Sequence, residues 1–181
     1  FMQEQIGFDY IEIDPFGSPN PFLATAVARI SRGGIIAVTA TDTAALTGTY
    51  PSVTKRKYWA TSSKNYLMHE LGLRILIRRI QLQGTQFDKA LIPILAYHKD
   101  HYFRVYFQNR RGKDDCDALL KQHQYFLFCP KCLNFKTSNF NKEKCKCEAE
   151  FIFSGPLWTG TLSNSDLLKK MVSENKFLEE Q

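Results

Sequence analysis

The segment Asp14-Pro15-Phe16-Gly17 places four chemically distinct groups in consecutive positions. The Asp14 carboxylate can accept hydrogen bonds from a substrate amine, and Pro15 presents a carbonyl without a competing N–H. Phe16 offers a flat face on which a planar base can stack, and Gly17 permits a sharp turn. These groups suit the binding of an exocyclic amine on a planar base. The alternative is an ordinary turn with a core phenylalanine.

Four cysteines form a second constellation, a C-x2-C pair followed by twelve residues and a C-x-C pair. Four thiolates on two turns can enclose a tetrahedral zinc ion, which would be structural because no coordination position stays open. The second pair has one spacer residue instead of two, which strains this geometry. The fifth cysteine, Cys116, is either a bystander or a substitute ligand. The predicted ligands are Cys129, Cys132, Cys145 and Cys147.

The elements around Asp14 are predicted to form a strand–helix–strand unit. Residues 8–14 read as a strand, and an apolar stripe from Leu23 to Ile30 predicts a helix with Asn20 as its N-cap and glycines 33 and 34 at its end. Residues 33–41 read as a buried parallel strand. Because ligands of open α/β sheets collect at the carboxyl ends of strands, Asp14 would lie at such a site.

Polar side chains also follow the second predicted strand, namely Thr39, Thr41 and Asp42. They could line a substrate pocket, or they could cap a loop. Residues 41–63 are predicted to be a long irregular loop, which in compact domains is usually functional or mobile. Its basic triplet at 55–57, like the arginines at 78 and 79, could contact phosphates, although each cation by itself reads as a solvated surface charge.

The rest of the chain predicts more α/β structure. Residues 66–80 read as an amphipathic helix, and residues 89–98 and 101–110 as an antiparallel hairpin. A charged linker with a short helix follows at 110–124, and then two aromatic-rich strands with cysteines at their edges. The segment SGPLWTG at 154–160 is expected to be a turn. A terminal helix is expected, capped near Ser163 or Ser165.

Composition narrows the functional classes. Of the 181 residues, 44% are hydrophobic, which excludes a disordered chain, and the net charge of +6 favours an anionic partner such as nucleic acid. No apolar run is long enough for a membrane span, and no secretory signal is recognised, so we expect a cytoplasmic protein with reduced thiols. The first residue is not Met, which suggests an excerpt of a longer protein.

Five collinear blocks between residues 9 and 160 carry a family resemblance: DPFGSPNPFL, GGIIAVTATDTAALTGTYP, HELGLRIL, DHYFRVYF and GPLWTG. DPFG resembles the (Asp/Asn/Ser)-Pro-Pro-(Tyr/Phe) motif of methyltransferases that modify exocyclic amino groups. Together the blocks closely resemble the tRNA (guanine-N2-)-dimethyltransferase family.

The resemblance implies transfer of methyl groups from S-adenosylmethionine to the N2 amine of guanine 26 in tRNA. By match to the motif, Asp14 and the Pro15 carbonyl would hold the amine, and Phe16 would stack on the base. Gly17 would leave room for the second methyl group. The block containing Arg104 suggests a role near the base or RNA, with a structural ion pair as the alternative. The expected partner is tRNA, without DNA or membrane.

One departure from the family pattern concerns the methyl donor. No glycine-rich cofactor loop precedes Asp14, so the cofactor-binding residues would lie mostly outside this sequence. The resemblance therefore implies the distal half of a Rossmann-like class I methyltransferase sheet in residues 1–112. A small tRNA-binding α+β domain with a zinc ribbon would follow in 113–181. The alternatives are a zinc-stabilised, non-catalytic RNA-binding protein, and an amino-methyltransferase that acts on another base or RNA.

Overall fold

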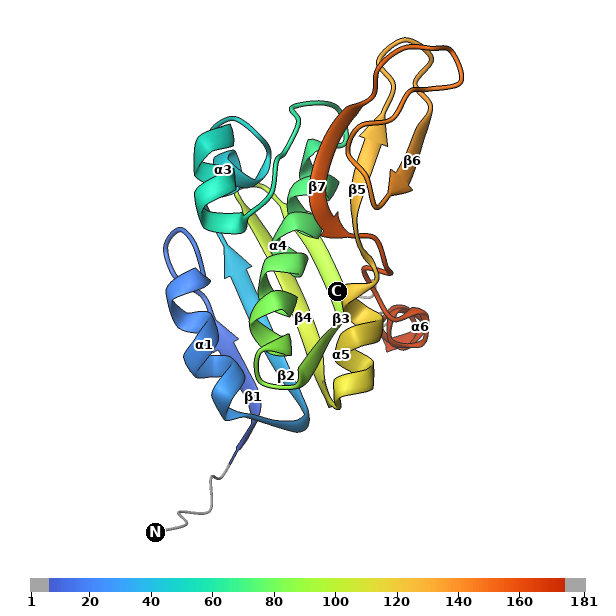
Figure 1. The fold of residues 1–181 in the computed structure, drawn as a ribbon. Helices are drawn as coiled ribbons and strands as arrows, with labels where there is room; N and C mark the ends of the chain where they lie inside the picture. The colour runs from blue at the N-terminus through green and yellow to red at the C-terminus, as the bar shows by residue number, and fades with distance from the viewer. Residues whose placement is uncertain (1–6, 175–181) are drawn as a thin grey trace.

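The computed structural model describes residues 7–174 as a mixed α/β protein with two sheets (Figure 1). The elements of the larger sheet and its helices are β1 (Phe8–Ile13), α1 (Asn20–Arg29), β2 (Ile30–Ala40), α2 (Thr43–Leu46), α3 (Pro51–Tyr58), α4 (Met68–Thr85), β3 (Lys89–Lys99) and β4 (Tyr102–Arg111). The remaining elements are α5 (Lys113–Leu120), β5 (His123–Phe128), β6 (Phe135–Ser138), β7 (Ile152–Trp158) and α6 (Ser165–Glu174).

The larger sheet has the order β1-β2-β4-β3. β1 and β2 run parallel, with Ile13 opposite Val38, while β4 lies antiparallel to both β2 and β3. The carboxyl ends of β1, β2 and β3 therefore meet at one edge of the sheet, and this edge carries Asp14. The predicted mixed sheet with an antiparallel hairpin is confirmed.

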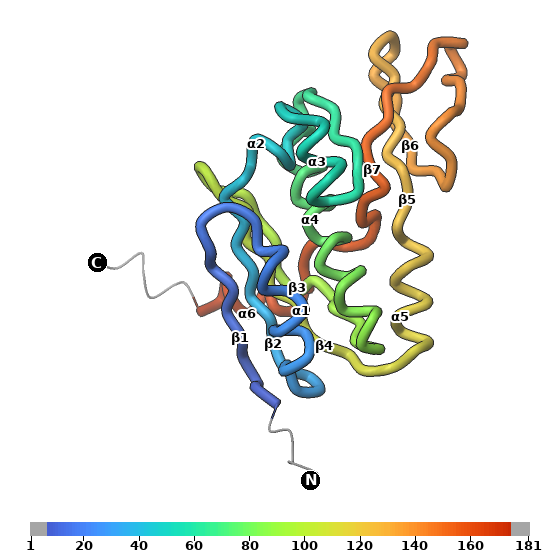
Figure 2. The backbone as a smooth tube through the Cα atoms, turned by 60° about the vertical axis from the view of Figure 1, so that its left-hand side comes forward, coloured from blue at the N-terminus to red at the C-terminus, as the bar shows by residue number. Residues whose placement is uncertain are grey.

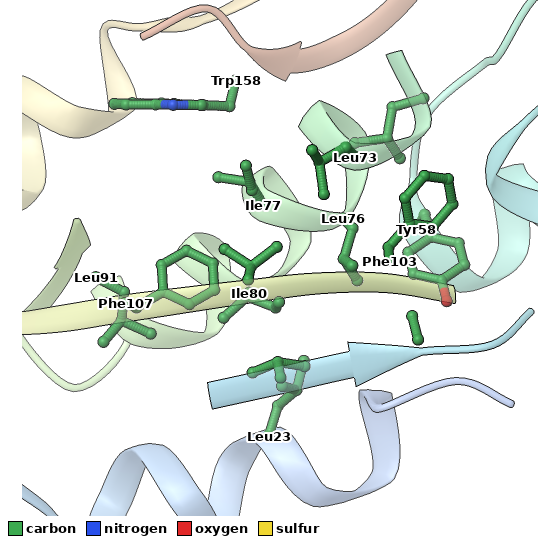
Figure 3. Packing of buried hydrophobic residues seen from close by; sticks show 14 of the residues in the cluster. Leu23, Tyr58, Leu73, Leu76, Ile77, Ile80, Leu91, Phe103, Phe107 and Trp158 are labelled. Carbon is green, nitrogen blue, oxygen red and sulfur yellow. The ribbon is translucent and has the colours of Figure 1, made fainter. Parts of the chain in front are cut away.

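The helices α1 and α4 contact each other and the sheet, and the main core lies beneath them (Figure 1). Buried residues cover most of the circumference of α4, because this helix packs against the larger sheet and also against β7. Figure 3 shows Leu76, Ile77 and Ile80 of α4 near Phe103 and Phe107 of β4. Burial of these α4 residues and of Leu23 from α1 fixes both helices on the sheet.

The smaller sheet has the order β6-β5-β7, and β7 packs along α4 (Figure 2). Two backbone hydrogen bonds tie β7 to the segment before α4: Thr61 N–H donates to Gly155 O at 2.8 Å, and Gly155 N–H donates to Thr61 O at 2.7 Å. Trp158 is buried in the same core cluster as the residues of α4. The division into domains at residue 113 stays a prediction.

The polar stretch at 41–63 is not the irregular loop that its composition predicts, because it contains α2 and α3. Tertiary contacts stabilise α3: Tyr58 is fully buried, and Thr54 donates hydrogen bonds to the carbonyls of Ala45 and Tyr50. Trp59, with φ +52°, ends the helix in the left-handed conformation. The signal for α3 is therefore largely non-local.

Two predictions of local structure are also wrong, namely the cap and end of α1 and the turn at 154–160. α1 begins at Asn20 with Pro19 as its N-cap, and it ends at Arg29, so β2 starts before the glycines. The SGPLWTG segment belongs largely to β7, which tolerates Pro156 because β7 is an edge strand. The predicted terminal helix is confirmed, because α6 begins at Ser165 and its cap, Asn164, lies between the two predicted cap positions. The Asn164 side-chain oxygen accepts hydrogen bonds from the N–H groups of Asp166 and Leu167.

None of the helices within residues 7–174 combines the length and the apolar character that a membrane span requires.

Candidate functional site

The Asp14–Gly17 turn follows β1 directly and is held against the end of β2. The Gly17 N–H donates to the Thr41 hydroxyl at 2.6 Å, and the Thr41 N–H donates to the Gly17 carbonyl at 3.0 Å. Gly17 has φ +89°, a conformation that L side chains rarely adopt, which explains the glycine at this position. These two hydrogen bonds fix the turn at the carboxyl edge of the sheet.

The reactive groups of this turn point outward. Asp14 is exposed, and the Phe16 ring is fully exposed at the surface. The alternative of a core phenylalanine is therefore wrong. A fully exposed aromatic ring beside an exposed carboxylate is a surface on which a planar ligand can stack.

Helix α3 anchors the same turn through a buried tyrosine. The Tyr58 hydroxyl donates to an Asp42 carboxylate oxygen at 2.6 Å and lies 3.0 Å from the Ser18 hydroxyl. Burial, together with the Asp42 carboxylate, raises the pKa of Tyr58 well above its usual value, so the hydroxyl keeps its proton. Lys57 pairs with the same carboxylate at 3.2 Å. Asp42 is thus turned toward α3.

Sequence reasoning missed Tyr58 and Ser18. They lie 40 residues apart, and no local pattern connects them. The signal that could have revealed Tyr58 is a large aromatic residue in a stretch otherwise poor in apolar residues. Its tertiary contacts explain why a short, polar helix forms beside the turn.

Arg104 joins β4 to β1 and β2. Its guanidinium donates to the Glu12 carboxylate at 2.8 Å and to the Thr39 hydroxyl at 2.5 Å, and it lies over the Tyr106 ring. The Arg104 guanidinium, aided by the Tyr10 hydroxyl, lowers the pKa of Glu12. The structural ion pair considered for Arg104 is therefore present, and its role in substrate binding stays a prediction.

Two cavities flank Asp14. One, of about 390 Å³, brings together four predicted site residues, Asp14, Thr39, Thr41 and Arg104; Glu12, Tyr97, Tyr102 and Tyr106 also line it. The other, of about 640 Å³, runs along β1 and α1 at the edge of the sheet and includes Asp14, Pro15 and Phe22 in its lining. Asp14 thus lies at the boundary of two spaces, one more polar and one mainly apolar.

The four predicted zinc ligands converge. The Sγ atoms of Cys129, Cys132, Cys145 and Cys147 all lie within 4.8 Å of one another. Zinc held by four thiolates at about 2.3 Å separates the sulfurs by about 3.8 Å, so the cluster fits a zinc ion. The closest sulfur pairs, at 3.4 and 3.5 Å, are too far apart for disulfides.

Both cysteine pairs lie on similar tight turns despite their different spacing. The Leu133 N–H donates to the Cys129 carbonyl, and the Glu148 N–H donates to the Cys145 carbonyl. Leu133 and Glu148 both have positive φ, at 61° and 65°. The pKa of the Cys129 thiol is lowered to about 6, mainly by a hydrogen bond from the backbone N–H of Cys132. The short C-x-C spacing therefore does not prevent convergence, and Cys116 lies in α5, outside the cluster.

The fold is that of a mixed α/β protein with an exposed turn and two cavities at the carboxyl ends of its parallel strands, where ligands of open α/β sheets commonly bind. A family model described as N2,N2-dimethylguanosine tRNA methyltransferase matches residues 1–181. The chain belongs to this family.

Named relatives agree with this assignment. A tRNA (guanine(26)-N(2)/guanine(27)-N(2))-dimethyltransferase of Aquifex aeolicus is 42% identical over 178 residues, which cover 96% of this chain and 45% of the relative. A tRNA (guanine(26)-N(2))-dimethyltransferase of Archaeoglobus fulgidus is 35% identical over 175 residues, covering 96% of this chain and 50% of the relative. The chain thus spans about half the length of these curated relatives.

A solved structure supports the fold. Trm1 from Pyrococcus horikoshii, in complex with S-adenosyl-L-methionine, matches with a TM-score of 0.82 and 38% sequence identity. The match covers 93% of this chain and 44% of that protein. The sequence described above therefore corresponds to less than half of that solved protein.

Proposed function

We propose that this chain is the carboxyl-terminal part of an S-adenosylmethionine-dependent enzyme that dimethylates the N2 amine of guanine 26 in tRNA. The observation that carries the proposal is the Asp14–Gly17 turn, which presents a carboxylate and a fully exposed aromatic ring at the carboxyl edge of the sheet. The family of the chain and the names of its relatives supply the substrate class.

The roles of the turn residues follow from their chemistry. Asp14 would accept one hydrogen of the guanine amine, and the Pro15 carbonyl would accept the other, which orients the nitrogen lone pair outward. Asp14 would then take the proton that the nitrogen loses. Phe16 would stack on the base after it leaves the helical stack, at the cost of unstacking a nucleotide. Gly17 would leave space for the second methyl group.

The described residues fit one wall of a cofactor site. The cavity along β1 lies beside Asp14 and is open at the sheet edge. S-adenosylmethionine, when bound, supplies the electrophilic methyl group. We propose that residues 1–112 provide the substrate half of the methyltransferase domain, and that the cofactor-binding loop lies in the part of the relatives that this chain does not span.

The 181 residues alone are therefore expected to bind S-adenosylmethionine poorly. Isothermal titration calorimetry should give little or no heat with the isolated chain and saturable binding with the complete protein. Micromolar binding by the isolated chain would contradict this division of the two half-sites.

Thr39, Thr41 and Arg104 are proposed to form the substrate side of the pocket together with Asp14. They share a cavity, and Arg104 reaches Thr39 and Glu12 from β4. Asp42 is proposed to act indirectly, since its carboxylate holds Tyr58 and Lys57. We also propose that residues 113–181 bind tRNA and contain a structural zinc ion. We further propose that the protein is cytoplasmic, which cell fractionation would check.

Methyl transfer to defined transcripts tests the function. The complete protein should transfer two methyl groups from labelled S-adenosylmethionine to a tRNA with guanine at position 26. The same tRNA with adenine at that position should gain none at that site, and nucleoside analysis should identify N2,N2-dimethylguanosine. Methylation of another base, or no transfer to any tRNA, would refute the proposal.

A further inference from the structure

Two adjacent arginines of α4, the buried Arg79 and the half-buried Arg78, have no acidic partner among the described residues. Arg79 is only 8% exposed, and neither its Nε nor its Nη1 has a hydrogen-bond partner among residues 7–174. Arg78 Nε is also buried and unpaired, and no carboxylate of the described residues lies within 4.0 Å of either guanidinium. A buried charge normally costs stability unless an opposite charge or a full set of hydrogen bonds offsets it. Arg79 is therefore not the solvated surface charge that the sequence suggests, and Arg78 is only partly exposed to solvent.

Both guanidinium groups contact Trp59. The Arg79 guanidinium lies 4.5 Å from the centre of the Trp59 ring, and Arg78 Nη1 approaches the Trp59 carbonyl at 3.5 Å. Stacking on an aromatic face stabilises an arginine partly, but it supplies no hydrogen-bond acceptor. Burial lowers the pKa of both guanidinium groups, which agrees with an environment that is short of negative charge.

The surroundings of this cluster are suited to nucleic acid. Trp59 is 52% exposed, so part of its ring is free to contact a base. The exposed side chains of Lys55 and Arg56 precede it in the last turn of α3 and extend the positive charge. Trp59 also directly follows Tyr58, whose hydroxyl is bonded to the loop that continues from the Asp14 turn.

We propose that Trp59, Arg78 and Arg79 form a subsite for a backbone phosphate of the bound RNA. Two neighbouring guanidinium groups match the oxygens of a phosphate through paired hydrogen bonds, which a lysine cannot reproduce. The bound phosphate supplies the negative charge that the cluster lacks. This assignment rests on the proposed function, since it takes tRNA as the ligand.

The salt dependence of tRNA binding tests the subsite in the complete protein. Arg79→Met removes the charge and keeps an apolar stem of similar length. We expect about tenfold weaker tRNA binding near physiological salt, and a slope of log Kd against log salt that is smaller by about one. Arg78→Met should act in the same direction. Arg32→Gln removes an exposed charge from the opposite end of the sheet and serves as the control, with an unchanged slope.

Thermal stability separates a binding role from a structural one. If Arg79 serves a bound phosphate, Arg79→Met should keep or raise the Tm of the free protein, because an unpaired buried charge is removed. A clear fall in Tm for both methionine variants would assign the pair to folding and overturn the proposal.

Inorganic phosphate probes the cluster directly. Titration at constant ionic strength should shift the indole N–H resonance of Trp59 in the wild-type protein and not in Arg79→Met, with the resonance assigned through Trp59→Phe. An absent shift, or unchanged salt slopes in both methionine variants, would overturn the subsite. Methyl transfer by the wild-type protein is measured in parallel, so its absence would refute the proposed function separately.

Discussion

Asp14→Ala will reduce methyl transfer to tRNA by at least about 1,000-fold, which corresponds to about 4 kcal/mol of transition-state stabilisation. The carboxylate is expected to hold the amine and to accept its proton, and no other exposed carboxylate lies within the turn. Asp14→Asn should lose almost as much activity, because the amide keeps an acceptor oxygen but cannot take the proton at neutral pH.

The variants should leave the fold intact. Asp14 is exposed and makes no side-chain hydrogen bond to the described residues, so its replacement should change the free energy of unfolding by less than about 0.5 kcal/mol. The Kd for tRNA should change little, since phosphate contacts dominate affinity. The loss should therefore appear in kcat.

Asp100→Asn provides a matched control. Asp100 is another exposed carboxylate at the same edge of the sheet, in the turn between β3 and β4, and its φ of +48° is one that asparagine tolerates. Single-turnover assays with saturating tRNA should show wild-type rates for this variant. If Asp14→Ala keeps full methyl transfer, the turn is not the catalytic site.

The position of Asp14 could be predicted because its signals are local. Each element is predicted by one local pattern: β1 by the alternation in residues 8–13, α1 by its apolar stripe and β2 by its β-branched run. The topology of the sheet then places the end of β1. The sequence signal for the hairpin of β3 and β4 is equally local, because only two residues connect the two predicted strands. The amphipathic stripe of α4 also predicted its helix, although the helix extends to Thr85.

The supports of the site could not be predicted because they depend on tertiary contacts. α3 forms where the Tyr58 hydroxyl contacts Ser18 and Asp42, and residues 51–58 show no apolar periodicity that would predict a helix. Arg79 offers a second example. Its basic side chain suggests a solvated surface, yet the packing of α4 and Trp59 buries it. Local patterns report which elements form, and only the assembled fold reports which polar groups become enclosed.

The spacing of the cysteines was a third kind of signal. Paired cysteines at short intervals predict a shared ligand with little dependence on the rest of the fold, because tight turns bring each pair together. The structure added the positive φ of Glu148, which lets the C-x-C pair close its turn with one spacer residue.

Cys129→Ser will remove most of the bound zinc and unfold the cysteine-containing ribbon. The smaller sheet has few buried residues near the cluster, and the segment between β5 and β7 is largely exposed, so the metal is expected to supply most of its local stability. Structural zinc sites contribute on the order of 10 kcal/mol or more to the folding of small zinc domains. The variant, or removal of zinc by a chelator, should abolish amide protection in residues 129–150, while the core of the larger sheet stays protected.

Cys116→Ala is the appropriate control for the zinc experiment, because Cys116 is buried in α5 and lies outside the cluster. This variant should lose some stability because removal of the thiol leaves a small cavity, but it should keep one equivalent of zinc.

Metal analysis of the purified wild-type protein decides first whether zinc is bound, since less than about 0.2 equivalents would remove the zinc assignment. If zinc is present, the pattern of amide hydrogen exchange shows which part of the protein the metal stabilises. Loss of protection confined to the ribbon would identify a structural ion that stabilises the ribbon alone, whereas loss across α4 and β4 would show that the metal supports the whole fold through the contact between β7 and α4.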